Sequence, residues 1–141
     1  MVIRMNRKVF VEELYNGLNM GMVAIDHLID KIQNEKLRDI VIHQRKQYGD
    51  LKEKIMQTSE YKYDDDKLKH QIMLESMIDL KTIWTDDAKI VKMLIEGCNQ
   101  SIMTITHLLN QEEQVDMKMK NYAHDFEEIS KSYIEALKRY L

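Results

Sequence analysis

The sequence predicts an all-α protein, a bundle of four long helices, and three observations lead to this prediction. The 141-residue chain contains no proline and only four glycines, a composition that favours helix along nearly its whole length. Apolar residues recur three and four positions apart over long stretches, which is the period of one face of a helix. The third observation is an internal repeat, in which residues 11–30 align with residues 91–110 at a constant offset of 80.

Seven of the twenty aligned positions in this repeat are identical. The identical pairs are Val11/Val91, Leu14/Leu94, Gly17/Gly97, Asn19/Asn99, Ile25/Ile105, His27/His107 and Leu28/Leu108. Two amphipathic helices share apolar positions merely because both are helical. Glycine, asparagine and histidine matching in register are harder to obtain in that way. We therefore interpret the repeat as the duplication of one helical hairpin.

The first hairpin is predicted over residues 6–57. Its first helix runs from about residue 6 to residue 33, with apolar positions from Val11 to Ile32 spaced three and four apart. A short polar turn at Asn34–Glu35 separates it from a second helix that ends near Gln57. This second helix is heavily charged on its outer faces, as expected of a helix half exposed to solvent.

The second hairpin is predicted over residues 87–141. Thr85-Asp86-Asp87 has the residue types of a helix N-cap and opens a helix over residues 87–111. The last helix begins near Val115 and continues to the end of the chain. Residues 58–86 connect the two hairpins and are expected to include a helix over 68–84. A single helix from residue 68 through residue 111 is the alternative.

The length of this connection predicts the topology. Tight turns make each hairpin antiparallel, whereas residues 58–86 can carry the chain back along the whole bundle, because a helix of about 17 residues covers roughly 25 Å. The helices on either side of the crossover then run parallel. We expect an up-down-down-up four-helix bundle that forms a single domain over residues 1–141.

Composition excludes several classes of function. The 24 acidic and 21 basic residues are spread along the chain and give a net charge of −3, without a basic patch suited to nucleic acid or to an anionic membrane. The uncharged runs are too short and too polar to span a bilayer, and the first residues have no apolar signal-peptide core. Cys98 is the single cysteine and has no intrachain disulfide partner. We expect a cytoplasmic protein, with association with a spore as an alternative.

The chain resembles the ferritin-like four-helix-bundle superfamily. The resemblance is to small bacterial members of unassigned activity, and more loosely to spore-coat proteins of the coat F type. It rests on the G-x-N-x-(G/S) and I-x-H-L patterns of residues 17–28 and 97–108, on LRDIVIHQRKQYGDLKEKI at residues 37–55, and on the terminal YIEALKRYL. It covers most of the chain and implies two duplicated hairpins joined by a helical crossover.

Iron-binding members of that superfamily hold their metal with inward glutamates and Glu-x-x-His pairs. No Glu-x-x-His occurs in this sequence. The reversed pairs His27-x-x-Asp30 and His124-x-x-Glu127 are the metal-ligand candidates, and both His27 and His107 lie nearly opposite the apolar stripe. We therefore expect solvated or interface histidines and no cofactor. The alternative is iron or another divalent metal on a non-standard ligand set.

Asn19 and Asn99 form the most informative polar pair, because they occupy equivalent positions at the edge of the two apolar stripes. One interpretation is a helix-to-helix hydrogen bond that sets register. The other is a small polar pocket in the core, to which His43, Gln44 and Gln47 add further polar groups.

The resulting hypothesis is a non-catalytic bundle that acts as a structural or protein-interaction module without a metal centre. The alternative is a metal-binding or oxidoreductase protein of the same fold. Residues 14–25 and 97–111 carry no charge, and their outer sides present Met20 and Met103. Large uncharged faces are typical of interfaces. The crossover can cover one of these two uncharged faces. The other is then free to form a homodimer, through the outer face of either the helix at 6–33 or the helix at 87–111. The sequence indicates no further protein partner.

Overall fold

The computed structural model describes residues 2–58, 85–111 and 116–141, with side chains from residue 8 onward within these ranges. Every long element in them is an α-helix, and they contain no strand. The four helices are α1 (Val2–Leu28), α2 (Glu35–Thr58), α4 (Asp87–Gln111) and α5 (Met117–Leu137). Two short 3-10 turns follow α1 and α5, η1 (Ile29–Lys31) and η3 (Lys138–Tyr140). The predicted all-α class with four long helices is therefore confirmed.

Side chains at the helix starts explain where the helices begin. The carboxylate of Asp86 accepts a hydrogen bond from the backbone N–H of Lys89 at 2.9 Å, and Asp116 accepts one from Met119 at 2.8 Å. Both satisfy N–H groups that have no partner within the helix. Residues 85 and 86 are not helical, so α4 begins anew at Asp87. Residues 59–84, which include the helix predicted over 68–84 and most of the crossover, lie outside the described residues.

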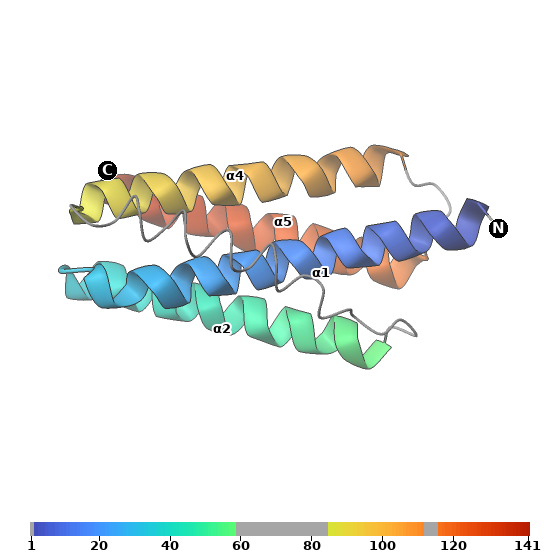
Figure 1. Ribbon diagram of the computed structural model, residues 1–141, viewed down its shortest axis with the longest axis horizontal. Coiled ribbons are helices and arrows are strands. Elements are labelled where there is room, and N and C mark those ends of the chain that lie inside the picture. Colours follow the sequence, from blue (N-terminus) through green and yellow to red (C-terminus); the bar gives the residue numbers. More distant parts are fainter. Residues whose placement is uncertain (1, 59–84, 112–115) are drawn as a thin grey trace.

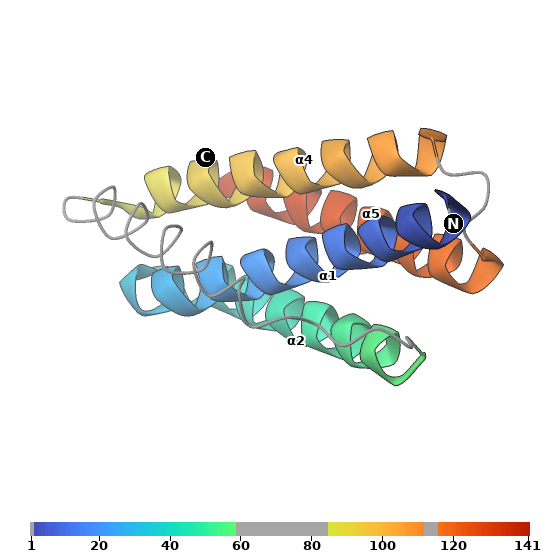
Figure 2. The same ribbon diagram turned by 45° about the vertical axis from the view of Figure 1, so that its right-hand side comes forward.

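The four helices pack side by side along their lengths (Figure 1). α1 contacts α2 and α4, and α5 contacts the same two helices. α1 and α5 run in one direction while α2 and α4 run in the other, as both views show (Figures 1 and 2). At one end of the molecule, Asp87 connects the start of α4 to the turn between α1 and α2. Its carboxylate accepts hydrogen bonds from the backbone N–H groups of Gln33 at 2.8 Å and Asn34 at 2.9 Å.

One continuous hydrophobic core lies between the four helices. Each helix contributes residues from the stripe that its sequence predicts, and each fully buried Leu, Ile or Phe side chain stabilises the fold by about 1.5–3 kcal/mol. The largest fully buried side chains are Phe10, Leu14, Leu18, Ile25, Leu28, Ile32, Leu37, Ile55, Ile90, Ile105, Met119 and Phe126.

The glycines have different packing roles. A Cβ atom at Gly21 would lie 2.8 Å from Cε2 of Tyr48, so the Tyr48 ring packs directly on the α1 backbone. A Cβ atom at Gly17 would make an ordinary contact with the Phe126 ring, at 3.4 Å. Gly97 aligns with Gly17 in the repeat but makes no matching contact, since a Cβ atom there meets nothing within 4 Å among the described residues.

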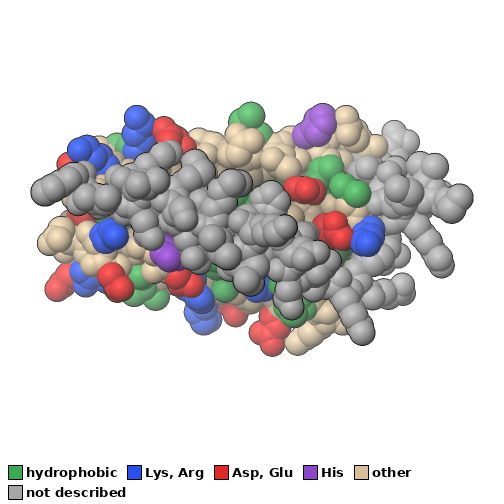
Figure 3. Space-filling view, viewed as in Figure 1, with side chains coloured by type: hydrophobic (Ala, Val, Ile, Leu, Met, Phe, Trp, Pro, Cys, Tyr) green, Lys and Arg blue, Asp and Glu red, His purple; other side chains and the backbone are tan. Residues whose placement is uncertain are grey.

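Charge is unevenly distributed over the surface. Along the upper edge of the view in Figure 3, over α4, charged side chains gather near the N-terminal end of this helix. Uncharged side chains and a histidine follow toward its C-terminal end. This change matches the sequence, in which residues 97–111 contain no Asp, Glu, Lys or Arg.

Candidate functional site

Five residues that carry polar atoms meet in the middle of the core. They form the core polar cluster, which consists of Gln44 and Tyr48 of α2, Cys98 of α4, and Ser130 and Tyr133 of α5; all five are buried. Each stands on the inward stripe of its helix, so the packing that buries the neighbouring apolar residues buries these as well.

Tyr48 is the centre of the hydrogen bonding in this cluster. Its hydroxyl lies 3.0 Å from Oγ of Ser130 and 3.5 Å from Sγ of Cys98. The Cys98 thiol also donates to the Ser130 carbonyl oxygen at 3.6 Å. The Tyr48 ring stacks on Phe126, with 5.7 Å between the ring centroids. One tyrosine therefore links α2, α4 and α5 through directional contacts.

Tyr133 differs from Tyr48, although both rings are buried to a similar degree. Its side-chain hydroxyl has no hydrogen-bond partner among the described residues and is shielded from solvent. Burial raises the pKa of both tyrosines, and the nearby Tyr48 and Cys98 raise that of Tyr133 further. Its hydroxyl is therefore a neutral hydrogen-bond donor at physiological pH.

Cys98 is a neutral thiol in this environment. Burial raises its pKa above the ordinary value, which outweighs the hydrogen bonds from Tyr48 and Ser130 that lower it. The nucleophilic form of cysteine is the thiolate, so this environment holds Cys98 in its unreactive form. With 7% exposure, Cys98 is a core residue.

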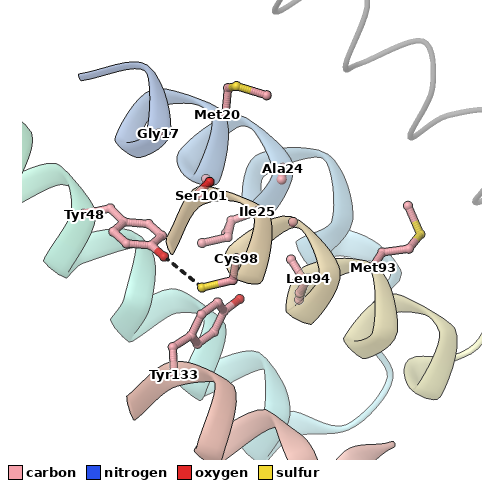
Figure 4. Close-up of a pocket in the computed structure, with 12 residues that line it drawn as sticks. Gly17, Met20, Ala24, Ile25, Tyr48, Met93, Leu94, Cys98, Ser101 and Tyr133 are labelled. Carbon is pink, nitrogen blue, oxygen red and sulfur yellow. Dashed lines mark hydrogen bonds between the residues drawn. The ribbon is translucent and has the colours of Figure 1, made fainter. Parts of the chain in front are cut away.

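A cavity of about 90 Å³ opens beside the cluster, between α1 and α4. In Figure 4, Tyr48, Cys98 and Tyr133 point toward one another at its inner end, while Met20 and Met93 lie at its periphery. Its lining residues are mostly apolar or small and none is charged: Gly17, Met20, Gly21, Ala24, Ile25, Tyr48, Met93, Leu94, Gly97, Cys98, Ser101 and Tyr133.

The sequence explains why there is space here. In the alignment of residues 11–30 with 91–110, Cys98 stands opposite Leu18, which is fully buried. The smaller cysteine side chain leaves room where α1 fills its own stripe with leucine. Gly97, which meets no neighbouring side chain, adds space on the same part of α4.

The metal-ligand candidates are separated into two places. His124 and Glu127 do meet on α5, with Nδ1 of His124 3.6 Å from Oε1 of Glu127. Glu127 also accepts the Thr106 hydroxyl at 3.0 Å and lies 3.8 Å from Nζ of Lys131, a cation beside the same carboxylate. His27 lies in the last turn of α1 and Asp30 in η1, where it is exposed. No group of three or more His, Cys, Asp or Glu side chains in the described ranges is arranged to hold a metal ion.

The expected polar core pair of Asn19 and Asn99 is not formed. Oδ1 of Asn19 accepts a hydrogen bond from Nζ of Lys52 at 2.9 Å, across the α1–α2 hairpin, while Asn99 is exposed. The two positions lie at the edge of their stripes, where a neighbouring helix must supply a long side chain to cover them. Lys52 does this for Asn19 by lying over the Tyr15 ring, 5.1 Å from its centroid, and burial lowers its pKa.

The three polar residues of α2 that were expected near this pair line a different part of the bundle from Asn19. They are His43, Gln44 and Gln47, and they border an open groove of about 370 Å³ between α2 and α5. Tyr133 borders both this groove and the cavity, so its ring stands between them.

Sequence reasoning did not predict that Gln44, Tyr48, Cys98 and Tyr133 meet. A signal was present, because inward positions in the middle of α2 and α5 hold side chains with polar atoms where the rest of each stripe is apolar. Buried polar atoms require partners, and these helices contact each other directly.

Comparison with protein-family models, characterised proteins and solved structures gave no significant match. No helix among the described residues is long and apolar enough to cross a membrane.

Proposed function

We propose that this protein is a non-catalytic helical interaction module that forms a homodimer through the outer face of α4. We further propose that the bundle is ferritin-like, that its two hairpins arose by duplication, and that it works in the cytoplasm without a metal centre. The helix directions and the repeat in the sequence support this relationship, and the single buried thiol of Cys98 supports a reducing compartment.

The observation that carries the proposal is the exposure of Met103. Its side chain is 63% exposed in the middle of the uncharged run 97–111, and Asn99, Gln100 and His107 around it are also exposed. A helix at the rim of a monomeric bundle is ordinarily charged on its outer side, as α2 is. The outer face of α4 therefore has the composition of a contact surface.

The corresponding face of α1 is a poorer candidate. Val23, which aligns with Met103, is buried at 8% exposure, and Met20 is less exposed than Met103. The burial of Val23 on the corresponding part of α1 favours α4 over α1 as the contact surface.

A second copy of the chain suits the α4 face better than a different partner does. Across a two-fold axis each patch meets itself, so any charge in the centre of the patch would meet an identical charge. The α4 face has none over residues 97–111. An apolar centre with surrounding amide and histidine side chains avoids this repulsion.

Light scattering at micromolar concentration tests the proposal. We expect twice the mass of the 16.9 kDa chain, and Met103→Asp should give the monomer because it places two like charges across the axis. The matched control is Met56→Asp on the charged outer side of α2, where methionine is 49% exposed. A wild-type monomer, or a dimer unchanged by Met103→Asp, would refute the proposal.

The alternative, a metal-binding or oxidoreductase protein that uses iron or another divalent metal, has one favourable observation, the contact between His124 and Glu127. Two side chains from one helix turn are fewer than the three or four that protein metal sites ordinarily use. Metal analysis of protein purified without chelator distinguishes the alternatives. Stoichiometric metal that is lost in both His124→Ala and Glu127→Gln would favour the alternative over our proposal.

A further inference from the structure

We infer that the cavity between α1 and α4 is a binding site for a small neutral molecule with an apolar body and one hydrogen-bond-accepting oxygen, such as a ketone or an ether. This inference is independent of self-association, since the residues that recognise the ligand lie inside the bundle.

The walls of the cavity select for an apolar, uncharged body. None of the lining residues carries a charge, and Ile25, Leu94 and Met93 are among the apolar side chains of the walls. A charged ligand would lose its hydration here without gaining a counter-ion. An apolar ligand loses little hydration and gains close contacts with these side chains.

The Tyr133 hydroxyl provides a buried polar contact. Tyr133 is 5% exposed, lines the cavity, and its oxygen lacks a partner in the described part of the chain. The Tyr48 hydroxyl and the Cys98 thiol are already engaged with each other and with Ser130, and the Ser101 hydroxyl is the other one that lines the cavity. A neutral hydroxyl with a free proton recognises an acceptor oxygen. The site therefore discriminates a ketone from a hydrocarbon of the same shape.

Water is a poor occupant of this cavity. A buried water ordinarily makes about three hydrogen bonds to protein polar groups, whereas the cavity offers the Tyr133 and Ser101 hydroxyls among walls that are largely apolar. Apolar cavities of about 150 Å³ hold benzene, which has six non-hydrogen atoms. A cavity of about 90 Å³ therefore encloses about four such atoms, and a slightly larger ligand extends into its outer end. The exposed residues Met20 and Gly97 line its outer end, where the described residues leave a route for entry.

The test is an NMR titration of the full chain with cyclopentanone and with methylenecyclopentane, which has the same shape without the oxygen. We expect both to bind and to shift the resonances of residues around Cys98. Changing Tyr133 to Phe should lower the ratio of the ketone affinity to the hydrocarbon affinity about fivefold, the equivalent of one lost hydrogen bond. Comparing the ratio within each protein removes the difference in hydration between the two probes.

Two filling variants test the location. Cys98→Leu restores the larger side chain found at Leu18 and should abolish binding of both probes. Should this variant fail to fold, Gly97→Leu fills the cavity from its outer end. Gly49→Ala is the matched control, because its Cβ would meet Met22 at an ordinary 3.6 Å and neither residue lines the cavity, so binding should be unchanged.

Several outcomes would overturn the inference. These are no binding of either probe, an unchanged affinity ratio in Tyr133→Phe, or shifts confined to the groove beside His43 and Gln47. A crystal structure with a water bonded to Tyr133 that cyclopentanone does not displace would do the same. Tyr133→Phe leaves the outer face of α4 untouched, so failure of this inference and failure of the homodimer proposal are separate results.

Discussion

At the scale of single residues, the two buried tyrosines have the same chemistry and different partners. Tyr48 bonds to Ser130 and Cys98, whereas the Tyr133 hydroxyl has no partner among the described residues. Desolvation opposes burial of both hydroxyls, but only Tyr48 regains hydrogen bonds in return. The two residues should therefore respond oppositely to loss of the oxygen.

Tyr48→Phe is expected to lower the free energy of unfolding by about 1–2 kcal/mol, because it leaves the buried Ser130 hydroxyl without its 3.0 Å partner. Tyr133→Phe removes an oxygen that makes no such bond and should change the stability by less than about 0.5 kcal/mol or increase it. Urea unfolding of the two variants and the wild type measures the difference. Equal losses in both variants would contradict the assigned hydrogen bonding.

The same cluster predicts how stability depends on pH. Cys98 and Tyr133 have ordinary pKa values of 9.0 and 10.0, and burial raises both in the folded chain. Above about pH 9 the unfolded chain loses these protons while the folded chain keeps them, so stability is full below this pH and falls as the pH rises. Urea unfolding at pH 8 and pH 10.5 should show this loss. We expect a smaller loss in Tyr133→Phe, and an unchanged loss would contradict the account.

At the scale of elements, local signals in the sequence located the helices well. The predicted N-cap at Asp86 and the predicted turn at Asn34 fall where the structure has them, because cap and turn residues act on their immediate neighbours. The end of α1 was placed too late, since η1 tightens the chain from Ile29 onward. The carboxylate of Asp87, which joins α4 to the α1–α2 turn, depends on tertiary contact and left no local signal.

The glycines test the packing between α1 and its neighbours. Gly97→Ala should raise the free energy of unfolding by up to about 1 kcal/mol, because alanine favours helix and its Cβ meets open space. Gly21→Ala should lower it despite the same helix preference, since its Cβ would lie 2.8 Å from the Tyr48 ring. Thermal unfolding of both variants measures this, and an increase for Gly21→Ala would contradict the close contact.

At the scale of the whole molecule, composition, periodicity and the internal repeat predicted the class. They did not predict which stripe residues meet. Asn19 and Asn99 were expected together because their positions match in the repeat, yet Lys52 of α2 covers one and nothing in the described ranges buries the other. The core polar cluster was missed for the same reason, because contacts between helices far apart in sequence depend on their rotation and register.

The central claim is that two copies of this chain meet through the outer face of α4. Equimolar mixing of isotopically labelled and unlabelled chains, followed by NMR that detects contacts only between a labelled and an unlabelled molecule, tests it most directly. We expect such contacts from the Met103 methyl group and none from Met56, which is exposed on the charged side of α2. Intermolecular contacts that avoid Met103, or no intermolecular contacts at micromolar to millimolar concentration, would contradict the claim.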